Sequence, residues 1–146
     1  MFERKSTAVW RGNGLEGTGA LTTQSGAFKD QPYSFKTRFA SEDGKAGTNP
    51  EELIAAAHAG CYSMALSFML TDAGHPPTEL RTSASVKVEK ANPGFAIVGI
   101  HLEVEGRVPG VSAEKFQELA GMAKKGCPVS KALAAVEITL TATLVA

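Results

Sequence analysis

Hydrophobic and polar residues alternate through the first 40 residues and again through much of the second half of the chain. In the first part, short alternating segments are separated by Gly12-Asn13-Gly14 and by Ser25-Gly26. This punctuation predicts antiparallel strands joined by hairpins. Residues 33–39 also follow a period of two, which predicts a strand with an aromatic face and with Lys36 and Arg38 on the opposite face.

The middle of the chain is a long apolar segment with a strong helix start. Asn49 can cap the helix, Pro50 suits its first turn, and Glu51 and Glu52 complement its dipole. We expect a helix from about Pro50 to about Thr71. Small or apolar residues occupy nearly all of its faces, which is typical of a central, buried helix. One stripe at helical spacing comprises Ile54, Ala57, Cys61, Met64 and Phe68.

Alternation resumes from Ala84 to Val104 around the turn Asn92-Pro93-Gly94, and this pattern predicts a second hairpin. Ser112 caps a helix that extends through Lys125, and Cys127-Pro128 then starts a short helix with the Cys127 thiol at its N-cap. The final alternating run, residues 136–144, is a half-buried strand. This order predicts an α+β fold with helices packed on antiparallel sheet, in one domain over residues 1–146.

Composition and charge narrow the possible classes of function. The chain has 146 residues, and 43% of them are hydrophobic, enough for an ordinary core. Lysine plus arginine and aspartate plus glutamate both number 15, so a net charge of zero argues against a nucleic-acid partner. The first residues lack the apolar core of a signal peptide, and the apolar stretch 53–70 is interrupted by polar and small residues. We therefore expect a cytoplasmic protein without a membrane segment.

Two cysteines, Cys61 and Cys127, are too few for a disulfide scaffold, so any disulfide between them is expected to be transient and catalytic. Cys61 lies in the most apolar helix, where packing as a small hydrophobic residue is the alternative to chemistry. Cys127 lies at a helix N-terminus after Lys124 and Lys125, an electropositive setting that favours a thiolate. A plain capping role stays open, but local features alone favour Cys127 as the reactive thiol.

One reaction that would use both cysteines is peroxide reduction, in which one thiolate attacks the O–O bond and becomes a sulfenic acid that the second thiol converts to a disulfide. That reaction requires a cation that holds the thiolate and stabilises charge on the leaving oxygen. Arg38 is a candidate, oriented by Glu51 or Glu52 through bidentate hydrogen bonds. The alternative for Arg38 is a solvated strand residue without a functional role. The alternative for Glu51 and Glu52 is that they only complement the helix dipole. His58 lies one turn before Cys61, but two cysteines and three scattered histidines give no metal-ligand spacing. We expect no metal site, and His58 is better explained as a locally bonded helix residue or one facing a partner chain.

Four segments together carry a resemblance to a known family: residues 31–39, 47–53, 57–67 and 123–130. They closely resemble the OsmC/Ohr family of organic hydroperoxide reductases, over nearly the whole chain. The combination of an Asn-Pro-Glu helix start, a cysteine ten residues after Glu51, and Gly-Cys-Pro-Val-Ser at 126–130 is highly specific. The context of Cys61 is more similar to the OsmC branch, osmotically inducible protein C, than to the Ohr branch.

The resemblance implies a thiol peroxidase that reduces organic hydroperoxides, and hydrogen peroxide more weakly, to alcohols and water. Cys61 would be the peroxidatic cysteine, Cys127 the resolving cysteine that closes a Cys61–Cys127 disulfide, and Arg38 and Glu51 the polar pair at the peroxide site. The family uses no prosthetic cofactor and is reduced by an external dithiol, lipoyl-type in the Ohr branch.

At the level of assembly, the resemblance implies an intertwined homodimer. Its sheets wrap around the central helices, and each site takes residues from both chains. A role in the response to oxidative and osmotic stress is also implied. The alternative function is a non-enzymatic redox-sensing or ligand-binding module that uses the same disulfide.

Overall fold

A computed structural model describes all residues 1–146 and divides them into two compact units, Met1–Leu53 and Ile54–Ala146. The first unit contains an antiparallel sheet of order β1-β2-β3, and it confirms the predicted β-meander up to residue 33. Its elements are β1 (Ser6–Arg11), β2 (Thr18–Thr23), β3 (Gln31–Tyr33) and α1 (Phe35–Phe39). The prediction of one domain over residues 1–146 stays a prediction.

The predicted strand over residues 33–39 is wrong, because residues 35–39 form the short helix α1. Ser34 caps this helix: its hydroxyl accepts the Thr37 N–H at 3.3 Å, while the Thr37 hydroxyl accepts the Ser34 N–H at 2.9 Å. Phe35 and Phe39 also satisfy helical spacing, and their ring centroids lie 5.3 Å apart. Arg38 does not point away from the aromatic residues, since its guanidinium lies 4.7 Å from the centroid of the Phe39 ring.

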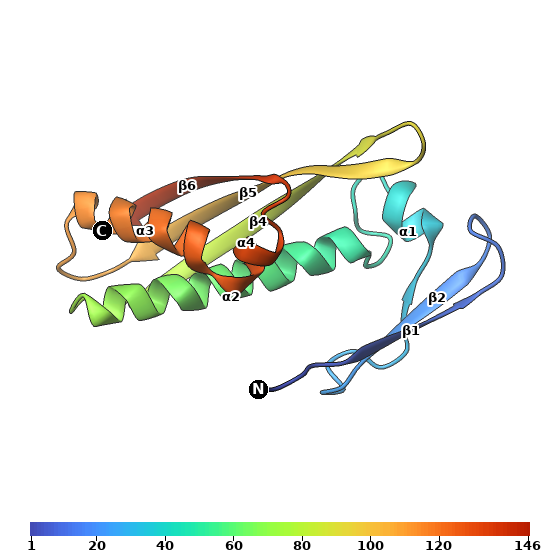
Figure 1. Cartoon of the computed structure of the whole chain (residues 1–146), viewed down its shortest axis with the longest axis horizontal. Coiled ribbons are helices and arrows are strands. Elements are labelled where there is room, and N and C mark those ends of the chain that lie inside the picture. Colours follow the sequence, from blue (N-terminus) through green and yellow to red (C-terminus); the bar gives the residue numbers. More distant parts are fainter. The chain divides into compact units, whose positions relative to one another are not determined.

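The second unit holds most of α2 and a three-stranded sheet of order β4-β5-β6 (Figure 1). The predicted hairpin is confirmed, since β4 and β5 pair antiparallel on either side of residues 91–94. The predicted helix over about 50–71 and the helix capped by Ser112 are confirmed as well. The elements are α2 (Pro50–Asp72), β4 (Glu79–Lys90), β5 (Phe95–Arg107), α3 (Ala113–Gly126), α4 (Pro128–Ala132) and β6 (Glu137–Val145).

The last strand corrects the expectation of a purely antiparallel sheet. β6 pairs parallel to β5, with Leu102 opposite Leu140. The reason is the connection between them: α3 and α4 carry the chain back along the sheet, and a helical crossover returns the next strand in the same direction. The fold is therefore α+β with a mixed sheet in the second unit.

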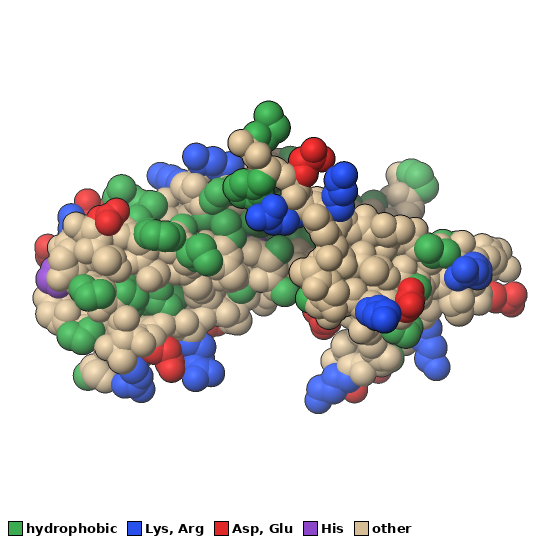
Figure 2. Space-filling view, turned by 90° about the horizontal axis from the view of Figure 1, so that it is seen from below, with side chains coloured by type: hydrophobic (Ala, Val, Ile, Leu, Met, Phe, Trp, Pro, Cys, Tyr) green, Lys and Arg blue, Asp and Glu red, His purple; other side chains and the backbone are tan.

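We expected α2 to be a central helix buried nearly all round, but within the chain only one of its faces is buried. His58, Tyr62, Leu66 and Leu70 are fully buried. Met64 and Phe68, by contrast, are 64% and 65% exposed. Figure 2 shows hydrophobic side chains gathered on the face that α2 presents. Because α2 is apolar nearly all round, its hydrophobic pattern alone does not indicate which side faces the core.

The buried face of α2 belongs to a core shared with β5 and α3. The Tyr62 hydroxyl donates a hydrogen bond to the Ala120 carbonyl at 3.1 Å and so ties α2 to α3. By length and hydropathy α2 could also cross a membrane, although 22% of its most apolar stretch is already buried in this fold. These contacts are those of a core helix that keeps one apolar face open.

Candidate functional site

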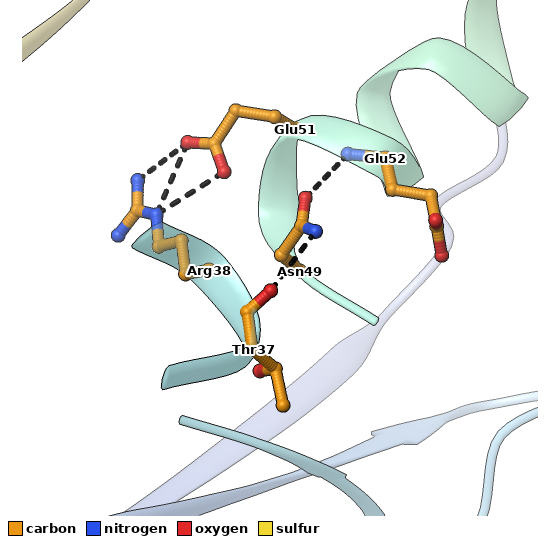
Figure 3. Close-up of polar contacts among 5 residues, drawn as sticks. All are labelled: Thr37, Arg38, Asn49, Glu51 and Glu52. Carbon is orange, nitrogen blue, oxygen red and sulfur yellow. Dashed lines mark hydrogen bonds and ion pairs between the residues drawn. The ribbon is translucent and has the colours of Figure 1, made fainter. Parts of the chain in front are cut away.

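Arg38 and Glu51 form a close ion pair between α1 and the first turn of α2 (Figure 3). The Arg38 Nη2 atom lies 2.7 Å from Glu51 Oε1, and Nε lies 3.1 and 3.2 Å from the two carboxylate oxygens. The Glu51 side chain is 10% exposed, whereas that of Arg38 is 39% exposed. The buried carboxylate therefore orients a guanidinium that still has an open side for a ligand.

The cap of α2 decides which glutamate faces Arg38. The Asn49 side chain accepts the Glu52 N–H at 2.8 Å and thereby caps the helix, as predicted. Its amide nitrogen donates to the Thr37 carbonyl at 3.4 Å, which links α1 to α2 (Figure 3). Glu52 instead accepts the Thr48 hydroxyl at 2.9 Å. Of the two candidate acids, Glu51 is thus the partner of Arg38.

A small pocket of about 240 Å³ lies beside Arg38 in the first unit. Most of its wall is aromatic, and the Trp10 and Tyr33 rings, 5.5 Å apart, form part of it. An apolar wall next to a guanidinium suits a small ligand with one polar end and one apolar end. The lining residues are Trp10, Gly14, Tyr33, Ser34, Phe35, Arg38 and Phe39.

The two cysteines come together in the second unit, although they are distant in sequence. Cys61 lies on α2 and packs against the core that contains Cys127, and both Cys127 and the Val129 backbone act electrostatically on its thiol. Cys127 occupies the N-cap of α4, as predicted, and its sulfur accepts the Ser130 N–H at 3.3 Å. Both are free thiols, Cys61 partly exposed and Cys127 fully buried. Only Cys61 is therefore open to a molecule arriving from solvent.

The surroundings of Cys61 disfavour its ionised form. Burial raises the pKa of the Cys61 thiol, and the neighbouring Cys127 raises it further, while the backbone hydrogen bond from Val129 opposes this shift. A thiolate is the nucleophilic form of cysteine, so Cys61 needs additional positive charge to react near neutral pH. Within the second unit no side chain supplies that charge through a contact with Cys61.

The structure therefore groups the four predicted site residues as two pairs. Arg38 contacts Glu51 in the first unit, and Cys61 contacts Cys127 in the second. Their meeting in one site stays a prediction. No three histidine, cysteine, aspartate or glutamate side chains gather where they could hold a metal ion.

Sequence reasoning did not identify Ser130 as part of the site. The Ser130 hydroxyl lies 3.1 Å from Cys127 Sγ and 2.7 Å from Nε2 of His58. His58 is fully buried and faces Ser130, 72 residues away in the same chain. The position of Ser130, three residues after a cysteine N-cap, was the available sequence signal, since that residue turns back toward the cap.

Burial lowers the pKa of His58 below its usual value of 6.5, which makes a prediction about stability. The unfolded chain then binds a proton on His58 more readily than the folded chain does. The free energy of unfolding is therefore unaffected by this proton above pH 6.5 and falls as the pH drops below 6.5. The free energy of unfolding should decrease on acidification, by at most about 1.4 kcal/mol per pH unit for this one proton. Urea unfolding at about pH 7.5 and about pH 5.5 measures the effect.

The matched variant is His58→Gln, since glutamine does not titrate. The difference between the two proteins removes the contribution of the carboxylates, which titrate in both. An equal loss of stability on acidification in both proteins would contradict a buried, neutral His58.

Comparison with known proteins shows the family to which this chain belongs. The family model described as OsmC-like protein matches residues 42–141, which include Glu51, Cys61 and Cys127. The chain belongs to the OsmC-like family. It is 51% identical over 139 residues to peroxiredoxin OsmC of Escherichia coli (strain K12), a match that covers 95% of this chain and 94% of that protein.

Other OsmC-like relatives extend the comparison. The chain is 36% identical over 95 residues to the organic hydroperoxide resistance protein OhrA of Bacillus subtilis (strain 168), covering 64% of this chain and 65% of that protein. The crystal structure of OhrB of Bacillus subtilis matches with a TM-score of 0.73 and 30% identity, over 99% of this chain and 98% of that chain. An OsmC-like protein from Mycoplasma pneumoniae shares the fold, with a TM-score of 0.76 at 17% identity, over 99% of both chains.

Proposed function

We propose that this OsmC-like protein is a cytoplasmic thiol peroxidase that reduces organic hydroperoxides, and hydrogen peroxide more weakly. The Cys61 thiolate attacks one oxygen of the peroxide, so an S–O bond forms and the O–O bond breaks. Cys61 becomes a sulfenic acid, and the leaving alkoxide takes a proton and departs as the alcohol. The names of the relatives, a peroxiredoxin and organic hydroperoxide resistance proteins, support this role.

Cys127 then attacks the sulfur of the Cys61 sulfenic acid. The S–S bond forms, the S–O bond breaks, and the hydroxyl leaves as water with the proton of the Cys127 thiol. An external dithiol, of the lipoyl type, supplies two electrons and two protons that restore both thiols. The contact between a partly exposed Cys61 and a buried Cys127 carries the proposal, because it gives one thiol access to peroxide and keeps the other ready to close the disulfide.

Arg38 supplies the positive charge that Cys61 lacks within its own unit. In the proposed homodimer the two pairs of residues join in one site, and the open apolar face of α2 is covered by the second chain. The guanidinium, held by Glu51, stabilises the thiolate and the negative charge that develops on the leaving oxygen. The aromatic pocket beside Arg38 supports an organic group on the substrate.

Peroxide consumption in the presence of a dithiol tests the proposal. A cumene-type hydroperoxide should be consumed catalytically and faster than hydrogen peroxide, with one alcohol formed per peroxide. A dithiol should sustain turnover better than a monothiol at equal thiol concentration. Its second thiol attacks the mixed disulfide with the protein, so the reductant forms an internal disulfide and the protein thiol is released. Disulfide formation without turnover by any dithiol would instead favour a redox-sensing module.

Cys127→Ser should separate the two chemical steps. Attack by Cys61 does not require Cys127, so the variant should still consume one peroxide per site in a single turnover. The sulfenic acid then has no resolving thiol and should accumulate, with sulfinic acid following at excess peroxide. Mass spectrometry of the Cys61 peptide measures both products. Complete loss of the first turnover would contradict the assigned division of roles.

A further inference from the structure

A chain of buried hydrogen bonds leads from Cys127 into the core. The Cys127 thiol donates to the Ser130 hydroxyl at 3.1 Å, and that hydroxyl lies 2.7 Å from Nε2 of His58. Cys127 and His58 are fully buried and Ser130 is 3% exposed. The three side chains come from α2, α4 and the junction between α3 and α4, so the fold itself assembles them.

The hydrogen-bond capacity of serine allows this chain to run in one direction, from Cys127 to His58. A serine hydroxyl has one proton to donate and accepts through its lone pairs. In the tautomer with the proton on Nδ1, the hydroxyl accepts from the Cys127 thiol and donates its own proton to Nε2 of His58. Burial lowers the pKa of His58 and keeps the imidazole neutral, as this arrangement requires. Each proton in the chain is thus directed away from Cys127.

The remaining nitrogen of His58 argues against a purely structural role. Nδ1 is buried and has no hydrogen-bond partner, and a buried polar atom without a partner destabilises a fold. An asparagine or glutamine could accept the Ser130 hydroxyl equally well. What the imidazole adds is the capacity to take a second proton on Nε2.

Other titratable groups in the neighbourhood do not provide an acceptor. Burial raises the pKa of Tyr62, whose hydroxyl already donates to the Ala120 carbonyl, so this phenol stays protonated. Burial likewise raises the pKa of Cys61, which lies on the same helix. Ser130 also lines a pocket whose charged side chains are Lys124, Lys125 and Lys131, and these are cations. No carboxylate is hydrogen-bonded to His58, Ser130 or Cys127.

We propose that His58, acting through Ser130, is a positioning residue that takes up the proton of Cys127 when this thiol closes the disulfide with Cys61. The step rests on the function proposed above and concerns only its second half. The thiol proton moves to the Ser130 oxygen as the serine proton moves to Nε2, and the S–S bond forms while the S–O bond of the sulfenic acid breaks. The hydroxide that leaves receives the proton back from His58, through Ser130, and departs as water.

Ser130→Ala tests the chain by removing one oxygen. After a single addition of cumene hydroperoxide, the sulfenic acid at Cys61 should form at the wild-type rate and should disappear into disulfide roughly 100-fold more slowly, the effect of losing general-base assistance. Ser63→Ala is the matched control, because it removes another hydroxyl whose bond, to Thr82 Oγ1 at 2.7 Å, lies elsewhere. Equal rates of disulfide closure in the two variants would overturn the proposal.

His58→Gln separates proton uptake from plain hydrogen bonding. Glutamine can accept the Ser130 hydroxyl but takes no proton, so closure should be as slow as in Ser130→Ala. In both variants the rate should rise about tenfold per pH unit from pH 7, since hydroxide then removes the thiol proton, whereas the wild-type rate should change little. Wild-type closure by His58→Gln would overturn the role of the imidazole. Failure of the wild type to consume the peroxide would instead count against the proposed function.

Discussion

Replacement of Cys61 by serine should abolish peroxide consumption, with a loss of at least about 1,000-fold in rate. A serine hydroxyl is far less acidic than a thiol and lacks the polarisable sulfur that attacks the O–O bond. Cys127 should not substitute for Cys61, because it is fully buried and a peroxide has no path to its sulfur. Stopped-flow measurement of peroxide loss with a dithiol present provides the rate.

The control for Cys61→Ser is a measurement of its stability, which shows whether the variant is still folded. Serine is close in size to cysteine, and Cys61 is only partly buried, so urea unfolding should give nearly the wild-type free energy. A folded Cys61→Ser protein that retains full peroxidase activity would show that Cys61 is not the attacking residue. It would also restore Cys127 as the candidate that local features favour.

Arg38→Ala should slow the attack on peroxide by roughly 100- to 1,000-fold, the usual cost of removing one preorganised group that stabilises transition-state charge. The side chain of Arg38 is 39% exposed, so the fold should tolerate its removal. Alkylation of Cys61 should slow as well and should require higher pH, because burial raises the pKa of this thiol and no cation would offset it. The two rates separate thiolate formation from stabilisation of the leaving oxygen.

Lys36→Ala is the matched control, since it removes an exposed cation from the same short helix. It should leave both rates within a factor of about two, because exposed charges act weakly through solvent. Arg38→Lys should lie between the two, as it keeps the charge but loses the bidentate contact with Glu51. An unchanged rate of attack in Arg38→Ala would remove Arg38 from the site.

Features with strong local chemistry could be predicted from the sequence. Asn49 and Pro50 define the start of α2, and Cys127 before Pro128 defines the N-cap of α4, because both signals act through bonds within a few residues. The alternation that gives β4, β5 and β6 is equally local. These elements also carry Glu51, Cys61 and Cys127, whereas the roles of these residues come from the family resemblance.

The errors arose where one pattern fits two structures. Phe35 and Phe39 satisfy a strand period and an i,i+4 helical contact alike, and only the Ser34–Thr37 cap distinguishes them. The direction of β6 depends on the crossover through α3 and α4, which is not visible in the strand itself. The buried side of α2 and the contact between His58 and Ser130 depend on tertiary packing, which the sequence of one uniformly apolar helix does not encode.

The roles of the two cysteines show the limits of local reasoning in another way. A helix N-terminus next to lysines favoured Cys127 as the reactive thiol, whereas the family resemblance assigned attack to Cys61. Exposure supports the resemblance, because Cys61 is the more accessible sulfur and Cys127 is held in the core by Ser130. In the proposed mechanism, access for the substrate therefore counts for more than the electrostatic advantage of a helix N-terminus.

The central claim, that Cys61 attacks a peroxide and Cys127 resolves it, is tested most directly by the product of one stoichiometric turnover. The reduced protein receives one equivalent of cumene hydroperoxide, and intact-mass and peptide mass spectrometry follow. We expect one equivalent of alcohol, a protein lighter by the two thiol hydrogens, and a single cross-link between the Cys61 and Cys127 peptides. Unconsumed peroxide with both thiols still reduced would contradict it.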